Sequence, residues 1–240
     1  MKILSIGNSF SQDGQKWLHK LAQQNGTDLI CHNLYIGGCS LSMHYENIVN
    51  NKSDYDFEVN GNSGVEKISI IDALRREKYD VITIQQVSGL SGIPETYFPY
   101  ISIISNIVRW EQPQAELYLH QTWAYEIDSN HGDFTHYNKD QGEMYRRLRD
   151  AYSTAAKIIN AKIIPTGDTI QKLRETLPEF DYKNGGLSLN RDGFHLSFDY
   201  GRFAAACVWF KTLTGKKIKI SEFEDFDISL LNKIIDVIEN

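Results

Sequence analysis

A serine lies directly after the first apolar run of the chain. Residues 3–6 (Ile-Leu-Ser-Ile) predict a buried strand of a parallel sheet, and Gly7-Asn8-Ser9 after them has the composition of a turn. The apolar residues at 17, 18, 21 and 22 then have helical spacing. Ligands of open α/β sheets bind at the carboxyl ends of the strands, so Ser9 is placed to act as a nucleophile if a histidine and a carboxylate reach it. The alternative is a turn serine that bonds to nearby backbone.

A carboxylate and an imidazole lie three residues apart near the end of the chain. Asp192 and His195 stand in a loop with Gly193, just before Ser197, which is a good N-cap for the apolar helix that follows. At this spacing the carboxylate can hold the ring through Nδ1–H and leave Nε2 free as a base. The alternative is a capping loop in which Asp192 accepts hydrogen bonds from backbone amides. Asp168, at the end of another predicted strand, is a rival carboxylate, but it is better placed to cap the next helix.

Other polar groups favour weaker hypotheses. His120, His131, Asp133 and His136 could hold a metal, but they lack a paired spacing such as His-Glu-x-x-His. We therefore expect a polar pocket wall there and no metal. The pair Gly37-Gly38 could cradle a phosphate at a helix start. No Walker lysine motif and no Gly-x-Gly-x-x-Gly motif is present, so we expect no cofactor.

Two segments do not fit a regular alternation of strands and helices. Residues 50–64 are polar and rich in turn formers, and residues 123–140 mix aromatic side chains with histidines and acids. Long loops inside a compact domain tend to be functional, so we expect both segments to flank a pocket. Trp123 and Tyr125 could stack on the face of a sugar, and core packing of one or both is the equally weighted alternative.

The remaining pattern predicts an α/β protein. Strand-like runs at 3–6, 29–36, 80–84, 117–120 and 162–165 alternate with helical patterns. The helices are expected near 15–25, 66–77, 97–110, 140–159, 168–176, 198–213 and 228–238. Such alternation is typical of a parallel sheet with right-handed crossovers. We therefore expect one three-layer α/β/α, flavodoxin-like domain over residues 1–240, with a five-stranded parallel sheet.

Composition excludes several functional classes. The net charge of −6 argues against a non-specific partner that is nucleic acid or an anionic membrane. No apolar stretch approaches the length of a membrane span, and the first residues do not resemble a signal peptide, so we expect a cytoplasmic protein. A periplasmic or secreted location is expected instead if a leader was removed. Cys31, Cys39 and Cys207 are too few and too widely spaced for a disulfide framework and are expected to be packing residues.

Four motifs together resemble a known superfamily. Gly7-Asn8-Ser9-Phe10-Ser11, Gly37-Gly38, Gln85-Gln86 and Asp192-Gly193-Phe194-His195 follow the order and approximate spacing of the SGNH/GDSL hydrolases. The whole chain resembles a bacterial branch of uncharacterised candidate hydrolases in that superfamily, of the domain-of-unknown-function type. The resemblance implies that Ser9 is the nucleophile and that Asp192 and His195 supply the carboxylate and the base.

The resemblance also implies an oxyanion hole. The backbone amides of Ser9 and of Gly38, with Gly37 as the alternative, would donate to the oxyanion. At the third motif the superfamily has Gly-x-Asn-Asp, with the asparagine amide as a donor, whereas this chain has Gln85-Gln86-Val87-Ser88. Glutamine carries the same amide on a longer stem. We expect Gln86 to serve, because neighbouring strand residues point to opposite faces and both glutamines cannot easily do so.

These residues predict a serine esterase. His195 would take the Ser9 proton as Oγ attacks an ester carbonyl, and water would then release the acyl-serine. The resemblance and the aromatic loop favour short-chain acyl esters, acetyl above all, on a carbohydrate or a small molecule. An acyltransferase that uses a sugar hydroxyl in place of water is one alternative. A non-catalytic flavodoxin-like binding module is another, but a pure binder has no need for the full set of Ser9, Asp192 and His195.

Overall fold

The computed structural model describes residues 1–64 and 66–240 of the chain. Within these residues, seven strands form one sheet in the order β4-β3-β2-β1-β5-β6-β7. Their bounds are β1 Lys2–Gly7, β2 Ile30–Tyr35, β3 Tyr55–Val59, β4 Lys67–Ile68, β5 Val81–Ile84, β6 Glu116–His120 and β7 Lys162–Ile164. The strand β1 lies in the middle of the sheet between β2 and β5 and is parallel to both.

The five predicted parallel strands are confirmed, but the sheet is mixed rather than purely parallel. The strands β3 and β4 extend the β2 edge in antiparallel pairing. Residues 55–59 were expected to belong to a loop that flanks a pocket, and that expectation is wrong. Their side chains alternate, with Tyr55 and Phe57 buried in the core beneath the sheet. Glu66, Lys67 and Ile68 belong to this antiparallel edge instead of the predicted helix over 66–77.

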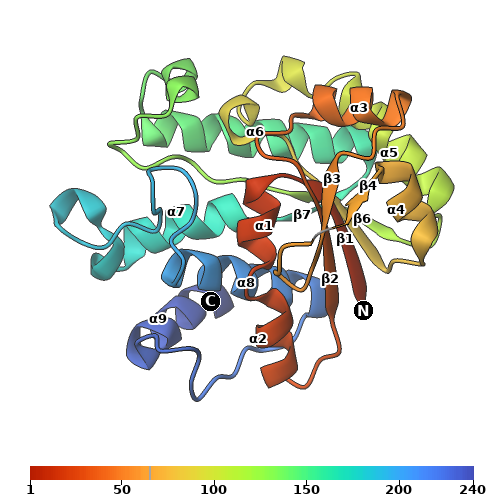
Figure 1. The fold of residues 1–240 in the computed structure, drawn as a ribbon. Coiled ribbons are helices and arrows are strands. Elements are labelled where there is room, and N and C mark those ends of the chain that lie inside the picture. The colour runs from red at the N-terminus through yellow and green to blue at the C-terminus, as the bar shows by residue number, and fades with distance from the viewer. Residues whose placement is uncertain (65) are drawn as a thin grey trace.

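Helices cover both faces of the sheet and complete the three layers (Figure 1). One layer holds α1 Ser9–Gln15, α2 Leu18–Gln24, α7 Thr166–Thr176, α8 Tyr200–Thr214 and α9 Ile228–Glu239. The other holds α3 Leu41–Val49, α4 Ile70–Arg76, α5 Tyr100–Glu111 and α6 Gln141–Ile159. Two separate apolar clusters fill the spaces between the sheet and these layers. Short 3₁₀ turns lie at η1 Ser88–Leu90, η2 Pro94–Thr96, η3 Gly132–Tyr137, η4 Pro178–Phe180 and η5 Tyr182–Asn184.

The first helix begins earlier than the apolar spacing predicts. Asn8 caps α1 because its side chain accepts a hydrogen bond from the amide of Phe10, while the Ser11 hydroxyl accepts from the amide of Asn8. Ser9 is therefore the first residue of α1, directly after β1. Helix α3 was not predicted at all, although Ser40 caps it in the same way. In the described part of the chain, no helix combines the length and apolar character needed to cross a membrane.

Candidate active site

Three side chains from the two ends of the chain form one hydrogen-bonded series. The Ser9 hydroxyl lies 2.8 Å from Nε2 of His195. Nδ1 of the same ring lies 2.7 Å from Oδ2 of Asp192. The sequence motifs therefore come together, with the serine at the carboxyl end of β1 and the other two residues in the loop before α8. Each distance is within hydrogen-bond range, so the ring can relay one proton to and from the serine.

The loop holds the carboxylate in a fixed orientation. Oδ1 of Asp192 accepts hydrogen bonds from the backbone amides of Phe194 and His195, at 3.1 and 2.7 Å. Burial opposes ionisation of Asp192, but the bonds from the His195 ring and these amides outweigh it and hold the carboxyl pKa below its usual range. Gly193 between them has a φ of +86°, which favours glycine, and a Cβ there would lie 3.0 Å from the Ser129 hydroxyl. Asp192 therefore accepts from backbone amides and from the ring at once.

The serine is presented by a cap that connects three segments of the fold. The side-chain Nδ2 of Asn8 donates to the carbonyl of Cys39, and the Oδ1 of the same side chain accepts a 2.7 Å bond from Gln85 Nε2. Gly7 permits the tight approach of helix to strand, because a Cβ there would lie 2.2 Å from the Ser11 hydroxyl. The turn that carries Ser9 is thus joined to the segment after β2 and to the end of β5 by side-chain hydrogen bonds.

A buried carboxylate joins the serine helix to the histidine loop, and the sequence analysis missed it. Asp13 in α1 has no exposed surface and accepts the backbone amide of Leu196 at 2.9 Å. It also accepts from Arg191 at 3.0 Å and from Arg202 at 2.8 Å. Two arginines near the Asp-x-x-His motif were the one pattern in the sequence that could have indicated a buried acidic partner. Asp13 thus connects α1, the loop and α8 around one charge cluster.

A small cleft of about 190 Å³ opens over Ser9. Its lining includes Ser9, His195, Gly37, Gly38 and Ser88. Gly38 has a φ of +64°, which leaves its amide in an exposed turn after β2. Within the described residues, neither the Ser9 amide nor the Gly38 amide donates to a protein acceptor. Both amides are therefore available to a ligand oxygen in this cleft, and their role as an oxyanion hole stays a prediction.

The side-chain amide of Gln86, which was expected to donate to the oxyanion, is directed away from Ser9. Its Nε2 donates to the carbonyl and hydroxyl oxygens of Thr96 at 3.1 and 3.0 Å. Its Oε1 accepts from the amides of Leu41 and Val87. Gln85, the alternative, is also occupied, because it donates to Asn8 and accepts from His120. Neither glutamine lines the cleft, since both buried amides are used to hold backbone and capping groups in place.

The two aromatic residues predicted to contact substrate are core residues. Trp123 and Tyr125 are both fully buried, so neither presents a face to a sugar. Trp123 stacks on Phe10 with ring centroids 4.2 Å apart, and its Nε1 donates to the carbonyl of Phe194 at 2.7 Å. The Tyr125 hydroxyl lies 2.8 Å from the hydroxyl of Ser88. Both are therefore core residues, which was the alternative to sugar stacking, although each touches residues that line the cleft.

The histidines between 120 and 136 have separate environments. His120 is buried between Gln85 and Thr166, and burial lowers its pKa to about 3, which keeps it neutral. His131 belongs to the wall of the cleft, whereas His136 bonds to the carbonyl of Gly89. Asp133 contributes its backbone amide to His131 Nδ1.

Asp168, the rival carboxylate, does not join the Ser9 series. It lies in the first turn of α7, where its Oδ1 accepts from Gln121 and its amide donates to the same side chain.

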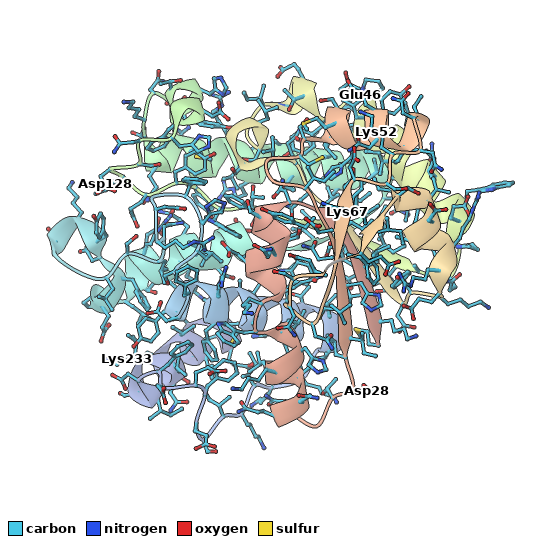
Figure 2. All side chains as sticks on the ribbon, in the orientation of Figure 1. Asp28, Glu46, Lys52, Lys67, Asp128 and Lys233 are labelled. Atoms are coloured by element: carbon cyan, nitrogen blue, oxygen red, sulfur yellow. The ribbon has the colours of Figure 1, made fainter. Side chains whose placement is uncertain are left out.

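A second, larger cleft of about 470 Å³ shares the walls formed by His131 and Phe194 with the small one. The segment 126–131 and the loop that contains Asp192 line it, so the expectation that residues 123–140 flank a pocket is confirmed in that part. Its lining is polar, with carboxylates, hydroxyls and amides from Glu126, Asp128, Ser129, Asn130, Tyr182, Ser188 and Asn190. Asp128 lies exposed at the margin of the molecule (Figure 2) and accepts a 2.8 Å bond from Tyr182. None of the described residues in 50–64 lines either cleft.

The α/β fold is similar to that of SGNH hydrolases. A candidate SGNH hydrolase from Slackia heliotrinireducens shares this fold at 20% identity and a TM-score of 0.60, over 89% of this chain and 98% of that one. A mutant of Axe2, an acetyl-xylooligosaccharide esterase from Geobacillus stearothermophilus, shares it at 13% identity and a TM-score of 0.55, over 91% and 96%.

The chain belongs to the DUF4886 family, a domain of unknown function, whose model matches residues 2–233. A DUF4886 family protein from Bacteroides uniformis is 36% identical, with a TM-score of 0.92 over 99% of this chain and 93% of that one. A search of curated proteins gave no match.

Proposed function

We propose that this protein is a serine esterase that acts through an acyl-serine intermediate. The observation that carries the proposal is the hydrogen-bonded series from Ser9 through His195 to Asp192. His195 Nε2 takes the Ser9 proton as Oγ forms a bond to the ester carbonyl carbon. The imidazolium then gives that proton to the leaving alcohol, and the acyl group remains on Ser9. Water repeats the sequence in the second half and releases the acid.

The two neighbouring clefts support an assignment in which the small cleft holds the acyl group of the substrate and the larger cleft holds its alcohol part. The small cleft over Ser9 has a volume of about 190 Å³, which favours an acetyl or other short acyl group. The larger cleft beside it carries hydroxyl, amide and carboxylate groups. Such groups exchange hydrogen bonds with a hydroxyl-rich alcohol and offer little apolar surface for a lipid chain. The proposed substrate is therefore a short-chain acyl ester of a carbohydrate.

A series of nitrophenyl esters tests the acyl part. Rates should fall beyond about four carbons, because a cleft of about 190 Å³ leaves little room to bury further methylenes. Acetylated xylo-oligosaccharides, the type of substrate named for Axe2, test the alcohol part, and free acetate is the product to measure. Chelator treatment should leave both rates unchanged, because the three residues do this chemistry without a metal. A steady rise in rate toward long acyl chains would contradict the assignment.

A further inference from the structure

The oxyanion of ester hydrolysis needs donors that are already in place when the charge forms. Backbone amides of Ser9 and Gly38 are free on one part of the small cleft. On the β5 side, the amide hydrogens of Gln86 are bound to Thr96 and Gln85 donates to Asn8. The two glutamines after β5 therefore have no amide hydrogen directed at the cleft, which leaves the other polar groups of this segment as candidate donors.

Ser88 is the polar side chain that this segment brings to the cleft. It is the first residue of η1, it is buried, and it lines the same small cleft as Ser9, Gly38 and His195. The turn is fixed behind it, because the hydroxyl of Ser91 donates to the Ser88 carbonyl at 2.7 Å. His195 Nε2 bonds to Ser9 and not to Ser88. Ser88 is thus beside the site without a base of its own, so it is not a rival nucleophile.

The hydroxyl of Tyr125 is the hydrogen-bond partner of the Ser88 hydroxyl and influences the direction in which the Ser88 hydrogen points. The two hydroxyl oxygens are 2.8 Å apart, and each can donate or accept. Burial raises the pKa of Tyr125, so the phenol keeps its proton. Among the described residues, Ser88 Oγ is the hydrogen-bond partner of that phenol. When Tyr125 donates to Ser88 Oγ, the buried phenol hydrogen has its partner and the Ser88 hydrogen is free for a ligand oxygen in the cleft, and this is the arrangement on which the proposal depends.

We propose that the Ser88 hydroxyl is a catalytic donor to the oxyanion and that Tyr125 is the positioning residue that polarises and orients it. The inference rests on the proposed esterase function. As the carbonyl carbon becomes tetrahedral, its oxygen gains negative charge and accepts from Ser88 Oγ–H together with the amides of Ser9 and Gly38. The bond from Tyr125 strengthens that donation, because hydrogen bonds in a series polarise one another. No proton is transferred from Ser88 or Tyr125 in this step.

Single substitutions test the two roles. Ser88→Ala should lower kcat on a nitrophenyl acetate about a hundredfold with little change in KM, as for other side-chain oxyanion donors. Tyr125→Phe should lower kcat about tenfold, because the Ser88 hydroxyl remains but loses its orienting partner. The double variant should be no slower than Ser88→Ala, since Tyr125 acts through Ser88. Ser105→Ala is the matched control, because it removes a buried serine hydroxyl that donates to the Ser102 carbonyl in α5, away from both clefts, and it should keep kcat near the wild-type value.

A rate ratio separates this role from a loss of folded protein. The ratio of rates on an oxo ester and on its thiono analogue does not depend on how much enzyme is folded, because both rates are measured on one sample. Sulfur accepts hydrogen bonds weakly, so the ratio should fall about tenfold or more when the Ser88 donor is removed. It should fall in Tyr125→Phe also and stay unchanged in Ser105→Ala. An unchanged ratio in Ser88→Ala, or in Tyr125→Phe if Ser88→Ala does not fold, would overturn the proposal.

Failure of this inference can be told apart from failure of the esterase proposal. If the wild type reacts with a fluorophosphonate at Ser9 and hydrolyses esters while Ser88→Ala keeps its kcat, only the role of Ser88 is wrong. If the wild type does neither, the proposed function is wrong and the role of Ser88 is lost with it.

Discussion

The carboxylate of Asp13 accepts a hydrogen bond from the backbone amide of Leu196, the residue directly after His195. Asp13 lies one turn along the helix that begins with Ser9. The helix of the candidate nucleophile and the loop of the candidate base therefore share one buried charge. Their separation in space is fixed by this bond and by the two arginines, although 186 residues separate Ser9 and His195 in the chain.

Removal of the Asp13 charge should destabilise the protein strongly. Asp13→Asn leaves the partly buried guanidinium groups of Arg191 and Arg202 without their carboxylate. Breaking a buried ion pair by loss of one partner costs about 3–5 kcal/mol. Urea unfolding should show a loss of this size. The control Asp150→Asn removes an exposed partner of Arg149 and should change the free energy of unfolding by less than about 1 kcal/mol. Equal effects of the two substitutions would contradict the role assigned to the ion pairs of Asp13.

Asp192 should act by fixing the tautomer of His195. In Asp192→Asn the side-chain oxygen can still accept the backbone amides, but an NH₂ group near Nδ1 favours the tautomer with its hydrogen on Nε2. That tautomer cannot accept the Ser9 proton. We expect kcat to fall on the order of a hundredfold, because Asp192 is 40% exposed and water can partly orient the ring.

The order of the variants is the decisive part of that measurement. Wild type should be fastest, then Asp192→Asn, with His195→Ala and Ser9→Ala together at the floor. Asp168→Asn is the matched control and should stay near wild type, because Asp168 bonds to Gln121 outside the series. A silent Asp192→Asn beside a large loss in Asp168→Asn would transfer the carboxylate role to the start of α7.

Trp123 should affect stability through the core and the loop. Trp123→Phe removes the bond to the Phe194 carbonyl and leaves that acceptor unsatisfied, which costs about 1–3 kcal/mol. Trp110→Phe is the matched control, because Trp110 is 84% exposed and its replacement should change stability by less than about 0.5 kcal/mol. Thermal melts give both values. If Trp123→Phe kept the wild-type Tm but raised KM for acetylated oligosaccharides, Trp123 would be a sugar platform after all.

Glu58 should make stability depend on pH. It is buried in β3, and burial raises its pKa despite hydrogen bonds from Asn33 and Gln12 that oppose the shift. A raised pKa in the folded state means that its contribution is fully present below the unfolded pKa, about 4.3, and is lost as pH rises through the folded value.

In Glu58→Gln the side chain does not ionise, so the loss of stability at rising pH that Glu58 causes is absent. The Tm of Glu58→Gln minus the Tm of wild type should therefore increase as pH rises above about 4.3, and then level off. Glu46→Gln, on the exposed side of α3 (Figure 2), should show no such trend. A difference that decreased with rising pH would show that the sign assigned to Glu58 is wrong.

Apolar periodicity was enough to predict the parallel strands and most helices, because these segments are buried on faces with a clear repeat. It failed at β3, where Asp56 and Glu58 alternate with Tyr55 and Phe57 in a short, partly polar strand between β2 and β4. It failed at α3 because this helix has only nine residues. It also begins, at its cap Ser40, shortly after a glycine turn, so its apolar repeat is too short to be recognised.

Side chains with a strict chemical role were easier to predict than side chains with many possible partners. Ser9, Asp192 and His195 follow a motif with one geometry, and the structure brings them together. A glutamine amide can bond to almost any backbone group, and the Thr96 partner of Gln86 cannot be derived from strand alternation. The same holds for Asp13, whose partners lie 178 or more positions away in the chain.

Labelling with a fluorophosphonate, followed by peptide mapping, tests the central claim most directly. The reagent forms a stable bond only with a serine that a neighbouring base activates. We predict a single adduct on the peptide that contains Ser9, lost in both Ser9→Ala and His195→Ala while the thermal melts stay cooperative. An adduct on Ser11 or Ser88, or full ester turnover in Ser9→Ala, would contradict the assignment of Ser9 as the nucleophile.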